Sequence, residues 1–80
     1  MAAPIYLDNR SVLVSTSKGL KRIHVPFVVV VVSSVDDLME GERMTVILVG
    51  FSKRDSLLYL IRNRYYLYSY FVIVLDKAPP

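Results

Sequence analysis

Three tyrosines at alternate positions near the C-terminal end are the residues whose spacing most directly suggests chemistry in this 80-residue chain. Alternate residues of a strand lie on one face, so Tyr66, Tyr68 and Tyr70 would form an aromatic stripe beginning at Arg64. Aromatic rings beside cations on a sheet stack unpaired bases, at about 1–3 kcal/mol per base. The stripe therefore predicts contact with single-stranded nucleic acid. The alternative is a structural role, with buried rings and hydroxyls at a wet edge.

Seven basic side chains fall into three groups that we expect near turns. They are Lys18, Lys21 and Arg22, then Lys53 and Arg54, then Arg62 and Arg64. If these turns lie at the ends of one small sheet, the groups would form a rim that contacts phosphates. The net charge of +3 is compatible with a polyanionic partner. The alternative is solvated charge that keeps an apolar protein soluble and protects its sheet edges.

Other chemistry is poorly represented in the chain. The acidic group formed by Asp36, Asp37, Glu40 and Glu42 does not have the spacing of a calcium-binding loop. One histidine, His24, and no cysteine cannot build a zinc site from histidine and cysteine ligands. No nucleophile elbow, P-loop or dinucleotide-binding glycine motif is present. We therefore expect a non-enzymatic protein without metal or cofactor, and a hydrolase that uses His24 is the least supported alternative.

The elements that must position these side chains are β-strands. Five consecutive valines, Val28 to Val32, follow Phe27, and β-branched side chains favour a pleated sheet. A strand that is apolar at every position is normally covered on both faces. A chain of this length has few residues with which to cover both faces of such a strand, although 54% of its residues are hydrophobic. The valines therefore predict a partner surface, and Val30→Asp would be expected to unfold the protein or make it misassemble in soluble form.

The rest of the chain supplies further strands and turns. Pro26 marks an edge, a bulge or the beginning of a strand, because it lacks a backbone donor. Ser34 and Gly41 are suited to begin and end a short helical turn over residues 35–40. We expect strands over 11–15, 21–32 and 43–51, turns over 16–20 and 52–56, and short tails over 1–4 and 77–80.

The last third has two interpretations. Residues 57–61 and 65–75 form a hairpin that turns at 62–64, because β-forming residues dominate this region. The alternative is a helix over 55–65 with apolar residues at helical spacing. In the hairpin, one face of the last strand would be a core face. Its members are Tyr65, Leu67, Phe71, Ile73 and Leu75.

Residues 38–63 resemble the first motif of the Sm-like RNA-binding family. Gly50 and Phe51 match the turn that ends a strand in that family, and the apolar run 57–61 matches the strand that follows. Ser52 and Ser56 stand where the family has the Asp and Asn that contact RNA, and the family's second motif, Arg-Gly, is absent before the last strand. The resemblance covers about a third of the chain and implies a small, strongly bent sheet or barrel.

The sequence thus predicts one mainly β domain over residues 1–80. It would be a small, strongly bent sheet or partly open barrel of about five strands with one short helical turn, and the alternative is α+β with the helix over 55–65. We expect a small subunit of a larger assembly that contacts RNA or DNA phosphates through its basic loops and a protein partner through an apolar sheet. The alternative function is a homo-oligomer or a partner-specific protein binder such as an inhibitor.

Two expectations concern location. No uncharged run reaches the ~20 apolar residues of a membrane-spanning helix, so we expect no membrane contact. The absence of cysteine favours a reducing interior, which suggests the cytoplasm.

Overall fold

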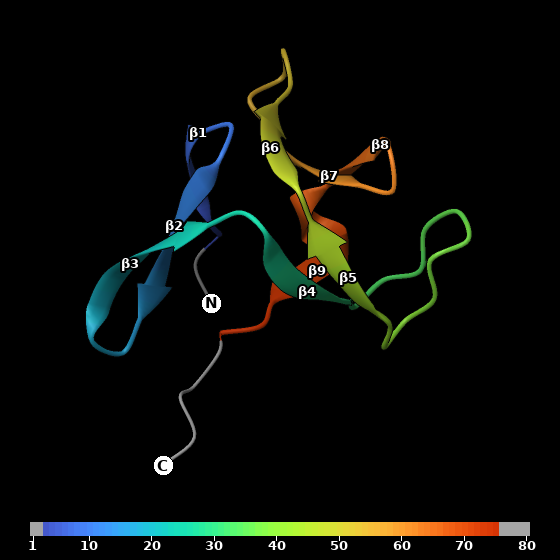
Figure 1. Ribbon diagram of the computed structural model, residues 1–80, viewed down its shortest axis with the longest axis horizontal. Helices are drawn as coiled ribbons and strands as arrows, with labels where there is room; N and C mark the ends of the chain where they lie inside the picture. The colour runs from blue at the N-terminus through green and yellow to red at the C-terminus, as the bar shows by residue number, and fades with distance from the viewer. Residues whose placement is uncertain (1–2, 76–80) are drawn as a thin grey trace.

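The computed structural model describes residues 3–75. These residues form nine short strands in three antiparallel sheets, together with one turn of 3-10 helix, η1 (Tyr68–Tyr70) (Figure 1). The first sheet has the order β1 (Ile5–Asp8), β2 (Ser11–Thr16) and β3 (Gly19–His24). The second has the order β5 (Arg43–Val46), β4 (Phe27–Val31) and β9 (Phe71–Ile73). The third has the order β6 (Leu48–Phe51), β7 (Leu57–Ile61) and β8 (Arg64–Leu67).

The mainly β prediction is confirmed, and the sheets are open. Among the described strands, β9 pairs only with β4, β3 only with β2, and β8 only with β7, so no pairing closes a barrel. β1 was not predicted as a strand, yet it pairs with β2 through Tyr6 and Val12. The tail expected over 77–80 lies outside the described residues.

Three of the predicted long strands are divided: those expected over 21–32 and 43–51, and the one expected over 65–75, which η1 interrupts between β8 and β9. The strand expected over 21–32 breaks at Val25 and Pro26 into β3 and β4, which belong to different sheets. Pro26 directly precedes β4, as expected for a residue that cannot donate to a sheet ladder. The strand expected over 43–51 breaks at Ile47, whose backbone N–H donates to Leu60 O at 3.1 Å. Each divided segment carries the chain from one sheet into the next.

The hairpin turn predicted at 62–64 is confirmed, and the alternative helix over 55–65 is wrong. The strand predicted over 65–75 pairs with β7 only through β8, because β9 pairs with β4. Ile61 faces Arg64 across β7 and β8, with Arg62 and Asn63 between them. These two residues have φ values of 52° and 67°. A two-residue hairpin turn of type I′ requires positive φ at both positions, so the local backbone matches the turn and excludes a helix here.

The helical turn expected over 35–40 is wrong, because this segment is a loop. The backbone N–H of Glu40 donates to Ser34 Oγ at 3.2 Å, and that of Met39 donates to Glu42 Oε1 at 2.7 Å. Side-chain acceptors of this kind compete with helical hydrogen bonds. Leu38 is fully buried and anchors the loop to the core.

The core lies between the three sheets and centres on Tyr59, which is 1% exposed. The Phe27 ring meets it edge-on at 5.5 Å between centroids, and the Phe71 ring lies at 5.9 Å. Valines from all three sheets surround these rings. They include Val12, Val29, Val31, Val46 and Val49.

Candidate functional site

Strand β4 has one buried face and one exposed face. Phe27, Val29 and Val31 point into the core. Val28 and Val32, on the other face, are 36% and 41% exposed. The described part of the chain therefore covers only one side of the five valines that were expected to be covered on both sides.

The exposed side of β4 continues onto β9. Val72 lies opposite Val30 in the β4–β9 register and is 41% exposed. The backbone N–H of Val74 donates to Val28 O at 2.9 Å, which places these two residues side by side. On the β5 side, Thr45 and Arg43 lie opposite Val28 and Val30. We call the apolar part of this surface the valine face; it consists of Val28, Val30, Val32, Val72 and Val74.

An open groove of about 330 Å³ runs beside β9. Val72 and Ile73 point to opposite faces of β9, and both line this groove, so it reaches the free edge of the strand. Val32, which directly follows β4, also lines it, so the groove shares Val32 and Val72 with the valine face. Val14 and Ser15 of β2 form its other wall, and Tyr59 lies within its lining. The groove brings together two sheets and the buried centre of the core.

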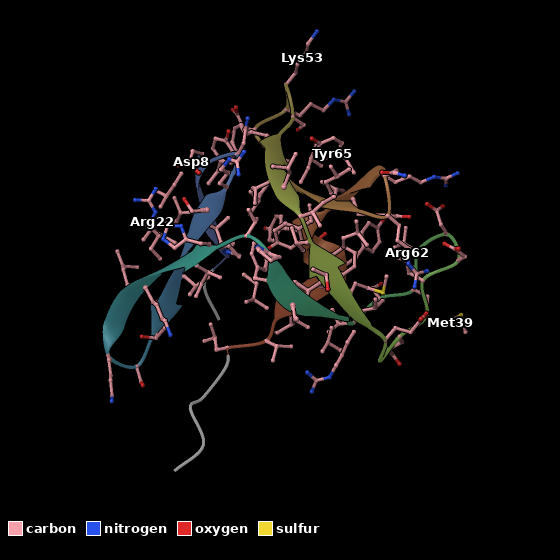
Figure 2. All side chains as sticks on the ribbon, viewed as in Figure 1. Asp8, Arg22, Met39, Lys53, Arg62 and Tyr65 are labelled. Atoms are coloured by element: carbon pink, nitrogen blue, oxygen red, sulfur yellow. The ribbon has the colours of Figure 1, made fainter. Side chains whose placement is uncertain are left out.

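The three basic groups are not brought together. Arg22 lies on β3 at one side of the molecule, Lys53 lies at the end of the β6–β7 turn, and Arg62 lies in the β7–β8 turn at the opposite side (Figure 2). Their group members Lys18, Lys21, Arg54 and Arg64 occupy the same three regions of the chain. The structure thus shows three separate basic regions instead of one rim.

Two of these basic side chains form ion pairs. Arg64 Nη1 lies 3.5 Å from Asp36 Oδ2. Arg22 Nη2 lies 3.0 Å from Asp8 Oδ2, and Arg22 Nε donates to Ser11 Oγ at 3.1 Å. The pKa of Asp8 lies below its ordinary value because the Arg10 backbone N–H donates to it, with further contributions from Ser11 and Arg22. Arg22 therefore helps to fix the β1–β2 turn.

The lowered pKa of Asp8 predicts a pH dependence. Because the folded protein favours the ionised carboxylate, this group stabilises the fold above its ordinary pKa of 3.8, and the contribution is lost as the pH falls through the lowered value. We expect Asp8→Asn to reduce the urea midpoint slightly at pH 7, with a difference from wild type that narrows below pH 3.8. A difference that is constant with pH would contradict this assignment.

The tyrosine stripe does not form an exposed face, because Tyr66 belongs to the core and Tyr68 and Tyr70 pack against it. The predicted faces of the last strand are wrong. Tyr66 is buried, and its ring meets Phe71 at 6.0 Å, whereas Tyr65 and Leu67 are exposed. η1 then interrupts the strand before β9. Tyr68 and Tyr70 lie in η1 and are half-buried. The 3-10 turn interrupts the strand that the stripe prediction assumed, and the three rings pack inward instead of facing solvent.

The remaining candidate residues show no arrangement for chemistry. Asp37 and Glu40 are exposed, and His24 is exposed at the end of β3. Within residues 3–75, no group of three metal-binding side chains is close enough to hold a metal ion. None of the described helical segments is long and apolar enough to cross a membrane.

Sequence reasoning missed the groove and the place of Tyr59 in it. Along β7, the buried residues Leu57, Tyr59 and Ile61 alternate with half-buried ones. This alternation of apolar residues could have predicted that Tyr59 is buried. Nothing local in the sequence indicates that β2 and β9 lie on either side of this tyrosine. Comparison of the chain with protein-family models, with curated proteins and with solved structures finds no match.

Proposed function

We propose that this protein is a small, non-enzymatic binding module that acts as a subunit of a larger assembly and docks through its valine face. The observation that supports this proposal is the exposure of the outward valines on β4 and β9. Each buried valine side chain contributes about 1.5–3 kcal/mol relative to an exposed one. Covering this face with another subunit would therefore stabilise both the fold and the assembly.

The partner surface that fits best is the valine face of a second copy. Two sheets pack face to face about 10 Å apart when both inner faces are apolar. Among residues 3–75, the charged residue that pairs across from the face is Arg43, which lies on β5 opposite Val30. A two-fold axis that runs through the valines parallel to the strands would place the two Arg43 side chains on opposite sides of the interface, where they do not repel each other directly.

Sedimentation equilibrium tests this proposal. We expect the wild-type protein to dimerise and the double variant Val28→Lys/Val72→Lys to be monomeric, because lysines on both strands would leave charges in an apolar interface. Leu20→Lys is the control, since Leu20 is 65% exposed on β3 and lies outside the valine face. A monomeric wild-type protein, or a dimer that survives the double substitution, would overturn the proposed interface.

Phosphate contact through the basic turns is the second candidate function. It is favoured by five of the seven basic side chains, which form no ion pair with described residues: Lys18, Lys21, Lys53, Arg54 and Arg62. Binding to labelled single-stranded RNA that weakens steeply as salt rises would support it. Apolar association strengthens or stays constant in stabilising salts, so the salt dependence separates the two functions.

A further inference from the structure

The free edge of β9 presents backbone groups to the groove. In an antiparallel pair, residues that bond to the neighbouring strand alternate with residues whose N–H and C=O point away from it. Val74 bonds to Val28 of β4, so the backbone groups of Ile73 and Leu75 point the other way. β9 has no second neighbouring strand among the described residues. Ile73 therefore offers a donor and an acceptor along the groove.

Tyr59 offers a further donor inside the groove. Its side chain is 1% exposed and lines the groove, yet its hydroxyl takes part in none of the side-chain hydrogen bonds within residues 3–75. No side-chain polar atom in this part of the chain is both closed off from solvent and unpartnered. The hydroxyl therefore keeps some contact with solvent, and the groove is the opening that Tyr59 lines. Burial, with Tyr68 nearby, raises the pKa of Tyr59, which keeps it a neutral donor.

The part of the groove lining that the structure describes is uncharged. The described residues of its lining are apolar or carry hydroxyls, including Val14, Ser15, Tyr68, Phe71 and Leu75. A charged ligand would lose its hydration here without gaining a partner. A volume of about 330 Å³ accommodates a few aliphatic side chains. The groove thus combines an unpaired strand edge, a buried hydroxyl donor and neutral walls.

We propose that the free edge of β9 binds an extended, uncharged, apolar peptide segment of a partner protein as an additional strand. The segment pairs with the backbone of Ile73, places alternate aliphatic side chains in the groove, and accepts a hydrogen bond from the Tyr59 hydroxyl at a main-chain carbonyl. Strand addition of this kind takes affinity from main-chain hydrogen bonds and specificity from the pockets for alternate side chains. The inference goes beyond the proposed function, because it does not require the valine face to associate.

The test uses the full chain and a short, blocked, fluorescently labelled peptide in which valine alternates with threonine. We expect saturable binding and slower hydrogen exchange at the Ile73 amide, because that amide becomes bonded in the added strand. The same peptide with alternate backbone amides methylated is expected not to bind, and neither is a peptide with glutamate in place of valine. Equal binding of either control peptide would overturn strand addition, and so would failure of the valine–threonine peptide to bind.

Two variants locate the site. Tyr59→Phe keeps the ring and removes the hydroxyl, and we expect about fivefold weaker peptide binding from the loss of one hydrogen bond. Ser15→Trp fills the groove from the exposed side of β2 and is expected to weaken binding more than about tenfold. Ser17→Trp, in the β2–β3 turn outside the groove, is the matched control. Unchanged binding to both groove variants would overturn the assignment, whatever the oligomeric state of the wild-type protein.

Discussion

The Val29→Asp variant is expected to be unfolded in dilute buffer. The neighbouring Val30→Asp variant, which the sequence alone predicts to unfold or misassemble, is now expected to fold, because Val30 is only half-buried. Val29 is completely buried in the core. An aspartate there loses about 1.5–3 kcal/mol of side-chain burial and leaves a carboxylate whose desolvation costs several kcal/mol more. A domain of this size has a total stability of about 4–12 kcal/mol, so the substitution removes most or all of it.

Val30 belongs to the valine face, where a carboxylate remains in contact with water. We expect this substitution to cost about 1 kcal/mol, comparable to the range of β-sheet propensities, and to prevent dimerisation. Circular dichroism during heating and light scattering measure the two effects separately. Cooperative unfolding of Val29→Asp at the wild-type temperature would contradict the core assignment. A dimeric Val30→Asp protein would contradict the valine face as the interface.

The Phe71→Ala variant is expected to lose about 3–5 kcal/mol of unfolding free energy, as other buried phenylalanines do. Three tyrosine rings lie within reach of Phe71, at centroid distances of 5.9 Å for Tyr59, 6.0 Å for Tyr66 and 6.4 Å for Tyr70. Removing the ring therefore leaves a cavity at the point where β8, η1 and β9 meet. Urea unfolding measures the loss as a shift of the midpoint.

Phe51→Ala is the matched control for this prediction. Phe51 is 48% exposed and contacts one ring, that of Tyr6 at 5.1 Å. We expect its removal to cost at most about 1.5 kcal/mol, the usual value of one aromatic pair. Because Phe71→Ala leaves little stability, Phe71→Leu provides a second, smaller cavity that keeps the protein folded. Equal costs for Phe71→Ala and Phe51→Ala would show that the aromatic cluster is not the centre of the core.

Local signals in the sequence predicted the parts of the fold that depend on neighbouring residues. The valine run identified β4, Pro26 marked where it begins, and Asn63 identified the hairpin turn. The loop over residues 35–40 was mistaken for a helical turn, because Ser34 and Gly41 are residues that also begin and end helices. In the folded chain, Leu38 is buried in the core from within a loop. This contact depends on residues distant in the sequence, so no local pattern indicates it.

The candidate site was harder to predict than the strands. The alternating tyrosines would form a stripe only if residues 64–75 were one uninterrupted strand. In the structure η1 follows Leu67 and changes which of the later side chains point inward. The basic groups were expected on one rim, but their turns lie at separate ends of the molecule, because three sheets replace the single sheet assumed (Figure 2). The groove depends on β2 and β9 coming together, which no local pattern encodes.

The pairing of β4 with β9 also has a consequence for how the chain folds. β6, β7 and β8 are joined by two consecutive hairpin turns, so their pairing closes only short loops. β4 pairs with β5 on one edge, but its other edge pairs with β9, which lies far along the chain. Loop-closure entropy makes such distant pairing slow relative to local pairing. The valine face is therefore expected to assemble last. Until then Phe27–Val31 and Phe71–Ile73, uncharged and rich in β-forming residues, are open to pairing with other chains. Early capture by a partner would protect newly made chains from aggregation.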